Sequence, residues 1–191
     1  MPRQILKPSL IVCLLASPAI AWAMFKPIRV LAPEWAGDIS CVSSRICIDN
    51  ALRYREASEL YEGALRFVAS AVGPFQHNPR VVFCSTEDCF RSFGFIKASA
   101  STVGNFGIVI SPRGWTPYYV RHEMVHHLQA EQLGALTLWL GPEWFIEGMA
   151  YSLSKDPRRP LSEPWQQHRA EFEGWYQKVG KERLWEEARK L

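Results

Sequence analysis

Apolar side chains recur along this chain with two different periods, one typical of strands and one typical of helices. Four short apolar runs predict strands, at residues 28–31, 45–48, 80–84 and 107–111. Between residues 49 and 72 apolar side chains return every three or four positions, which predicts an amphipathic helix. Asp49 is placed to cap this helix, and Gly73-Pro74 ends it. We expect its apolar stripe to face the core: Ala57, Leu60, Tyr61, Ala64, Val68 and Ala71.

The second half of the chain is predicted to be mainly helical. A helix over residues 118–133 has Thr116 as its cap, Pro117 in its first turn and Gly134 just beyond its end. A shorter helix follows at residues 142–151. The remaining predicted segments are a turn at 87–94, a loop at 157–164 and two helices at 165–179 and 181–191. Strands and helices together predict an α+β domain with a short mixed sheet.

Composition indicates one globular domain. The chain has 191 residues, 48% of them hydrophobic and 13% aromatic, which supplies enough apolar surface for a sizeable core. We therefore assign residues 24–191 to a single domain. The formal net charge is only +3, and no block of basic residues alternates with aromatic ones. Nucleic acid is for this reason not an expected partner.

The first 23 residues have the layout of a secretory signal peptide. A basic start is followed by an apolar stretch at residues 10–16 and by Ala21-Trp22-Ala23, so cleavage is expected after Ala23. The alternative is an uncleaved membrane anchor, because residues 8–25 carry no charge and approach the length that spans a bilayer. Both alternatives predict an exported domain, periplasmic or secreted, whose only membrane contact is this segment.

Export determines how the remaining cysteines are interpreted. Cys41, Cys47, Cys84 and Cys89 form an even set, and disulfides are the default in an oxidising compartment. Three pairings are possible, and the short polar spacers favour Cys41–Cys47 and Cys84–Cys89. A zinc-binding cysteine cluster is the less favoured alternative.

The chemically richest stretch is R-H-E-M-V-H-H at residues 121–127, which holds three of the five histidines. His122 and His126 are four positions apart, so on a helix they point the same way and can bind one metal ion. Glu123 lies beside them with its carboxylate free to act as a base, whereas His127 points elsewhere. The pattern predicts a zinc site with its own general base.

Two histidines need a third ligand, and the helix at 142–151 offers Glu143 and Glu147. Glu147 is preferred because apolar residues surround it, and a buried carboxylate is costly unless a positive group binds it. Glu143 lies in the first turn, where the helix dipole already explains an acidic residue. The neighbouring Gly148 allows another backbone to approach closely.

H-E-M-V-H followed by W-F-I-E-G-M-A-Y resembles the gluzincin zinc metallopeptidases, in particular the small bacterial peptidase-MA-like proteins. The resemblance covers residues 105–154. It implies a zincin-like fold, Zn²⁺ bound by His122, His126 and Glu147, and Glu123 as the base that acts on a zinc-activated water. It also implies that the strand near residues 106–110 is the sheet edge beside which a peptide or protein substrate lines up.

The sequence also departs from the best-known branch of that family. Thermolysin-like members have an aspartate four residues after the glutamate ligand, and here that position is Tyr151. Support for the histidines is therefore expected from a backbone carbonyl or from Asp156. Residue type alone offers three candidates for stabilising an oxyanion: Tyr151, Tyr176 and His168. The alternative function is an exported zinc-binding domain that recognises peptides or envelope partners with little or no turnover.

Overall fold

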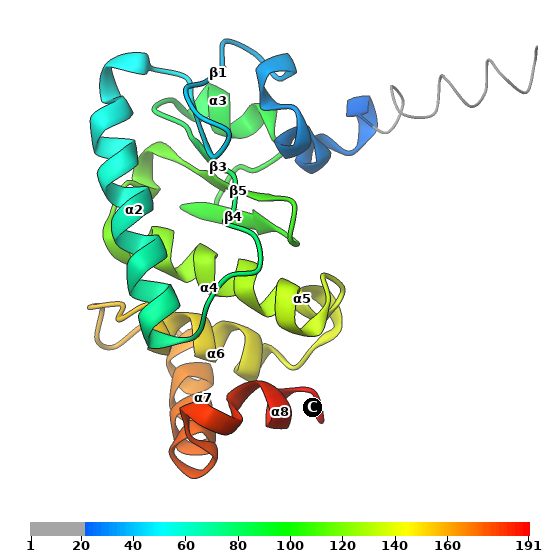
Figure 1. Cartoon of the computed structure of the whole chain (residues 1–191), viewed down its shortest axis with the longest axis vertical. Helices are drawn as coiled ribbons and strands as arrows, with labels where there is room; N and C mark the ends of the chain where they lie inside the picture. Colours follow the sequence, from blue (N-terminus) through cyan, green and yellow to red (C-terminus); the bar gives the residue numbers. More distant parts are fainter. Residues whose placement is uncertain (1–21) are drawn as a thin grey trace, which may run out of the picture.

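The computed structural model describes residues 22–191, which form a small mixed sheet with helices on both faces and a helical region below it (Figure 1). The predicted leader at residues 1–23 lies almost entirely outside the described residues. Within residues 22–191 no helix is both long enough and apolar enough to cross a membrane.

The sheet has five strands in the described part of the chain, in the order β1-β2-β3-β5-β4. Their bounds are β1 Ser40–Cys41, β2 Ile46–Ile48, β3 Val81–Phe83, β4 Ala100–Val103 and β5 Gly107–Ile110. The three central strands are parallel, while β1 and β4 pair antiparallel at the two edges. The predicted α+β class with a short mixed sheet is confirmed. The sequence pattern located the three central strands, and it missed both edge strands.

The helices account for most of the remaining chain. The α-helices are α2 Tyr54–Ala71, α3 Glu87–Ser92, α4 Pro117–Leu133, α5 Thr137–Leu140, α6 Glu143–Leu153, α7 Trp165–Val179 and α8 Leu184–Ala188. The 3-10 helices are η1 Lys26–Leu31, η2 Pro33–Trp35, η3 Ala51–Arg53, η4 Pro112–Gly114 and η5 Lys181–Arg183. The last predicted helix, 181–191, is thus shorter and begins as a 3-10 turn.

Alternate residues of the central strands divide between two cores. Ile46, Phe83 and Ile110 belong to the larger core, which α2 and α4 cover, together with the buried stripe of α2. Leu60 and Ala71 of that stripe are only partly buried. Cys47 and Val82 point to the opposite face and pack in the smaller core with residues of η1 and α3. The sheet is therefore buried on both faces at its centre.

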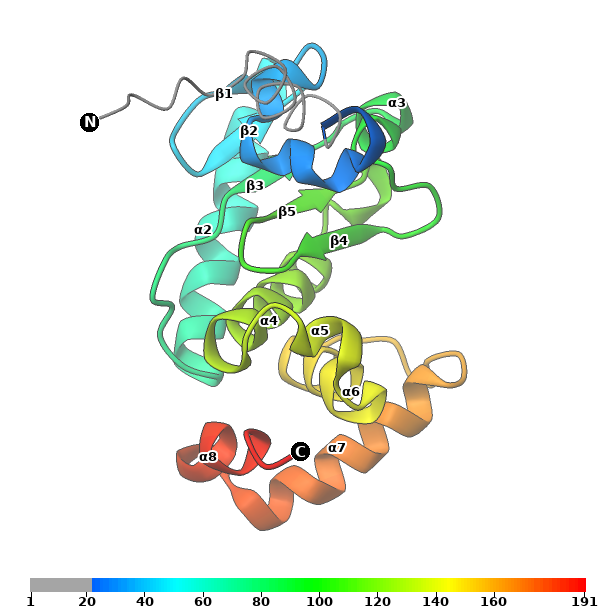
Figure 2. The same cartoon turned by 90° about the vertical axis from the view of Figure 1, so that its right-hand side faces the viewer.

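A helical region formed by α6, α7 and α8 lies on the far side of α4 from the sheet (Figure 2). Gly148 of α6 permits the close approach of α7, because a Cβ atom at this position would overlap the backbone carbonyl of His168. The predicted close approach at Gly148 is confirmed. Gly134 ends α4 with a φ of 95°, a conformation that glycine adopts readily.

The predicted strand at residues 28–31 is wrong, because these residues belong to the 3-10 helix η1. Pro27 lies in its first turn, where its fixed φ and missing N–H suit a helical start. The backbone N–H of Ile28 donates to the carbonyl of Phe25 at 3.1 Å, so the segment forms local bonds and joins no ladder. An apolar run alone does not distinguish these outcomes.

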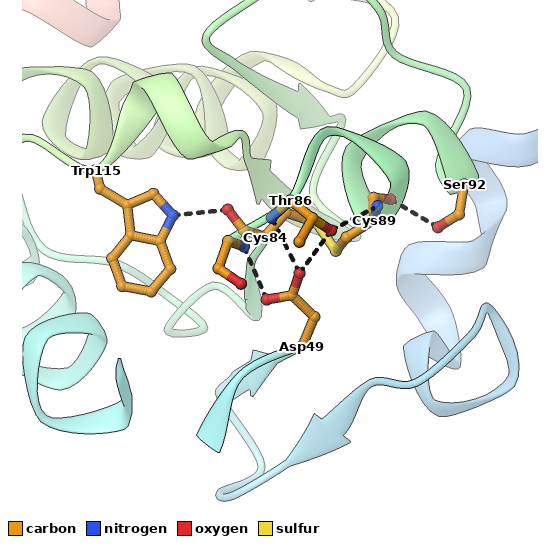
Figure 3. The surroundings of a disulfide bond; sticks show 7 residues. Asp49, Cys84, Thr86, Cys89, Ser92 and Trp115 are labelled. Atoms are coloured by element: carbon orange, nitrogen blue, oxygen red, sulfur yellow. Dashed lines mark hydrogen bonds between the residues drawn. A yellow bond between two sulfur atoms is a disulfide. The ribbon is translucent and has the colours of Figure 1, made fainter. Parts of the chain in front are cut away.

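Asp49 does not cap the following helix, in contrast to the prediction. The Asn50 side chain accepts from the N–H of Leu52 instead, at the start of η3. Asp49 accepts hydrogen bonds from the backbone N–H groups of Ser85 and Thr86, at 2.7 and 3.1 Å (Figure 3). It thereby fixes the loop after β3, which carries one of the disulfides.

Both predicted disulfides, Cys41–Cys47 and Cys84–Cys89, are present. The first joins the paired strands β1 and β2. The second joins the end of β3 to α3, in the segment that was predicted to be only a turn (Figure 3). Thr86 caps α3 by accepting from the N–H of Cys89 at 3.2 Å. Two disulfides are compatible with an exported protein.

Candidate metal centre

Helix α4 places His122 and His126 side by side at one cleft. Their Nε2 atoms are 3.0 Å apart, and both side chains are largely buried. Thr116 occupies the position before the helix, yet its side chain makes no capping hydrogen bond. The helix begins instead with Pro117, whose geometry suits the first turn. The i, i+4 spacing therefore brings the two imidazole rings together on one face of the helix, as the sequence predicted.

Glu147 of α6 completes a group of three. Its Oε2 lies 3.5 Å from Nε2 of His122, and its Oε1 lies 3.5 Å from Nε2 of His126. One ligand atom from each residue lies within 4.8 Å of the others, and such a group could hold a metal ion. Glu143, the rejected alternative, is exposed on the first turn of α6.

The three residues fit a zinc-type ion in both distance and donor type. Zinc bonds of about 2.0–2.1 Å at tetrahedral angles place neighbouring ligand atoms roughly 3.3 Å apart. The distances between the ligand atoms here are 3.0, 3.5 and 3.5 Å. Two imidazoles and one carboxylate leave a fourth position free, which is typical of catalytic rather than structural zinc sites.

Gln129 fixes the orientation of the His126 ring and makes its Nδ1 a hydrogen-bond donor. The amide nitrogen of Gln129 donates to the carbonyl of Ile146 at 3.1 Å, so its oxygen must face Nδ1 of His126, at 2.8 Å. Since that oxygen can only accept, Nδ1 of His126 carries the proton. Its Nε2 is then the ring nitrogen that faces His122 and Glu147, and it can bind a metal ion when it carries no proton. Gln129, which is fully buried, also joins α4 to α6.

The electrostatics of Glu147 match a ligand. Burial alone would raise the pKa of its carboxyl, but the adjacent His126 and His122 outweigh that effect and lower it to about 2. Glu147 is therefore a carboxylate at neutral pH.

Glu123 lies beside the three residues and outside their group. Its Oε2 accepts a hydrogen bond of 2.8 Å from Thr102, whose hydroxyl also lies 2.9 Å from the backbone oxygen of Glu123. Burial raises the pKa of the Glu123 carboxyl to about 6, although His126 and the Thr102 hydrogen bond oppose the shift. The Glu123 carboxyl can therefore both take up and release a proton near neutral pH.

His127 points away from the site, in agreement with the prediction. Its Nε2 lies 3.2 Å from the carbonyl of His77 and 3.6 Å from Glu131. The remaining face of α4, with Met124, Val125 and Leu128, is fully buried in the larger core. One face of α4 thus lines the cleft, a second contacts His77, and a third packs in the larger core.

The site opens into a cleft of about 440 Å³ between β4 on one side and α5 and α6 on the other. Residues 98–102 form the sheet-side wall, and His122, Glu123, His126 and Glu147 form the floor.

The prediction that the strand near 106–110 is the sheet edge is wrong. β5 lies between β3 and β4, so β4 is the edge strand beside the site.

Of the three residues proposed by residue type as oxyanion donors, Tyr151 alone lines the cleft. Tyr151 lines the cleft, with its ring centroid 4.5 Å from that of His122. Tyr176 stacks on Phe172 at 5.3 Å and does not line the cleft. His168 lies on α7 behind Gly148, also outside the lining. Burial raises the pKa of Tyr151 to about 12, so its hydroxyl keeps its proton at neutral pH.

Asp156 was predicted as a possible support for the metal-site histidines, and this prediction is wrong. Its carboxylate is almost fully buried and pairs with Arg158 instead.

Reasoning from the sequence also missed three residues at the site: Gln129, Thr102 and Arg158. Gln129 was detectable, since it stands three positions after His126 on the same helical face. Thr102 and Arg158 belong to segments whose positions only the tertiary structure reveals.

Comparison of the chain with protein families, with curated proteins and with solved structures found no match. The resemblance to gluzincin peptidases accordingly depends on the two sequence motifs alone.

Proposed function

We propose that this chain is an exported zinc metallopeptidase with a zincin-like fold, which hydrolyses peptide bonds. The observation that supports this most is the convergence of His122, His126 and Glu147 on one point, with the buried Glu123 beside them. A cleft bounded by a strand edge gives that point access to an extended substrate.

The residues divide the chemistry between them. His122, His126 and Glu147 would hold Zn²⁺, which supplies an electrophile and a water of lowered pKa at neutral pH. Glu123 takes the proton of the attacking water and returns it to the leaving amine. Thr102 holds the Glu123 carboxylate in place. The Tyr151 hydroxyl donates a hydrogen bond to the carbonyl oxygen as negative charge develops there.

The free edge of β4 provides the substrate with backbone partners. The N–H of Ser111 donates to the carbonyl of Ser99 at 3.0 Å, which fixes the alternation along this antiparallel pair. Ser101 and Val103 then bond to β5, while the backbone groups of Ala100 and Thr102 face the cleft. A peptide can add to this edge as a further strand.

The test combines metal content with cleavage of a broad peptide mixture by the domain spanning residues 24–191. We expect stoichiometric zinc and cleavage that a chelator abolishes and added zinc restores. Glu123→Gln should retain the zinc and lose at least about 100-fold in turnover, because it removes the base and leaves every ligand. Glu143→Gln, on the same face of α6 as Glu147 but exposed, is the matched control and should change neither quantity.

The outcomes discriminate between functions. Zinc without any cleavage would favour the recognition domain. Loss of zinc in Glu123→Gln would make Glu123 a ligand and contradict its assignment as the base. Protein without stoichiometric metal would contradict both functions.

A further inference from the structure

The two ends of the cleft differ in chemistry. Thr102 bonds to Glu123 in the middle of α4, whereas a Cβ on Gly104 would lie 3.1 Å from Ala135, just beyond that helix. β4 and α4 therefore run in the same direction. The end of the cleft near Gly104 is apolar, with Leu138, Trp139 and Ile146. The other end, near Ala98, holds Arg158 from the loop between α6 and α7, which lies at the side where β4 begins (Figure 2).

Arg158 is held in a fixed orientation. Its Nε and one Nη donate to Asp156, whose side chain is only 1% exposed, and its other Nη donates to the Tyr119 hydroxyl at 3.1 Å. The rings of Tyr118, Tyr119 and Tyr151 surround the guanidinium, with centroids 5.3, 4.9 and 5.8 Å from Cζ. The buried carboxylate and the rings leave the group little freedom to turn.

The guanidinium still has donors to offer. Arginine has five N–H groups, and these contacts use three of them. Among the described residues, none accepts from the remaining two, one on each terminal nitrogen. The side chain is 40% exposed and lines the cleft. Two adjacent N–H groups of an arginine match the two oxygens of a carboxylate.

Arg158 is close enough to the metal centre to act on a substrate bound there. Tyr151 contacts both, since its centroid is 4.5 Å from that of His122 and 5.8 Å from Cζ of Arg158. An extended peptide advances about 3.3 Å per residue, so this span corresponds to at most roughly three residues.

We propose that Arg158 is a specificity residue that selects peptides carrying a carboxylate within about three residues of the cleaved bond, at the Ala98 end of β4. The carboxylate can be an acidic side chain or the carboxyl terminus of the peptide, since both present the same two oxygens. This inference rests on the proposed function to the extent that the ligand is a peptide lying along β4.

The experiment measures peptide binding to zinc-loaded Glu123→Gln protein by fluorescence anisotropy, so that no turnover is needed. One set of peptides carries a single Glu at each position in turn, compared with Gln at the same position, all with amidated ends. A second set compares a free carboxyl terminus with the amide. At one position or at the terminus, the carboxylate should tighten binding about 10-fold, the effect of one charge-assisted contact.

Arg158→Gln, made in the same background, should reduce this preference to less than about twofold and leave the affinity for the neutral peptide unchanged. Because Arg158→Gln leaves the buried Asp156 unpaired, the double variant Asp156→Asn/Arg158→Gln removes both charges and tests the same loss in a neutral pair. Arg66→Gln, with a side chain that is 74% exposed on α2, is the control and should keep the preference.

Equal binding of Glu and Gln peptides in the Arg158-containing protein would overturn the proposal, as would a preference that survives in both Arg158 variants. In either case peptides still bind and the proposed function stands. If no peptide of either set binds, and none is cleaved by the protein with Glu123 intact, the proposed function fails together with this inference.

Discussion

At the scale of single residues, the orientation of His126 depends on Gln129. The amide of Gln129 accepts from Nδ1 of His126 and donates to the carbonyl of Ile146, so one side chain fixes a ligand and a helix contact together. Partners of this kind commonly change metal affinity by 10–100-fold when they are removed, because the imidazole loses its preferred tautomer and orientation.

Replacing Gln129 with Leu should therefore weaken zinc binding by roughly 10–100-fold. The free energy of unfolding should also fall by about 1–3 kcal/mol, because the buried Nδ1 of His126 loses its acceptor and the carbonyl of Ile146 loses the donor that joins it to α4. Competition with a chromophoric chelator measures the first quantity, and denaturant titration of the metal-free protein measures the second.

Gln132→Leu supplies the control for this prediction. Gln132 lies on the same helix, and among the described residues its side chain accepts a hydrogen bond only from the exposed Arg189, at 3.5 Å. If both glutamines had the same effect on zinc affinity, the assigned role of Gln129 would be wrong.

The residue scale also shows what sequence reasoning can reach at a site. His122, His126 and Glu147 were found because a helical period and an unfavourably placed carboxylate are visible in the chain itself. Thr102 was not found, because its contact with Glu123 depends on the pairing of β4 with β5 and on the packing of the sheet against α4. Arg158 depends in the same way on how the α6–α7 loop folds back.

At the scale of elements, the contact between α6 and α7 determines where Glu147 lies. The two helices make the most extensive contact between any elements of the described chain, and Gly148 is placed where the backbone of α7 comes close to α6. A side chain at this position would overlap the backbone of His168 and push the helices apart. Glu147 is the neighbouring residue, so the metal ligand would move with its helix.

We predict that Gly148→Ala lowers the free energy of unfolding by roughly 1–3 kcal/mol, because the overpacked contact outweighs the better helix propensity of alanine. Gly174→Ala in α7 is the matched control, since a Cβ there meets no described atom within 4 Å. It should stabilise the protein by about 0.5–1 kcal/mol through helix propensity. Denaturant titration of the metal-free variants checks both signs. A stabilising Gly148→Ala would contradict the close approach.

The helices and strands also show which sequence patterns predict structure reliably and which do not. The long helix α2 was predicted because its apolar residues return every three or four positions over its whole length. Helix α4 was predicted from Thr116 and Pro117 at its start and Gly134 at its end. β4 was missed because A-S-T-V is short and its small polar residues do not resemble a buried strand. Residues 28–31 were assigned to the wrong element because a brief apolar run fits a strand as well as a 3-10 turn.

At the scale of the whole molecule, the candidate metal centre joins two parts of the fold. His122 and His126 come from the helix that packs on the sheet, and Glu147 comes from the helical region below it. In the unfolded chain these side chains do not converge, so an ion bound to all three stabilises the folded state. The expected gain is about 2.7 kcal/mol when free zinc is 100 times the dissociation constant.

For a chain of this size we predict that such a zinc excess raises the melting temperature by roughly 5–10 °C, measured by calorimetry or circular dichroism. Glu147→Gln should lose most of this increase at the same zinc concentration, because the link between the two parts of the fold is reduced to the histidine pair of one helix. Glu123→Gln and Glu143→Gln should keep it, since neither removes a proposed ligand. An equal increase in Glu147→Gln would show that zinc binds α4 alone, and the carboxylate of α6 would then have to be removed from the proposed site.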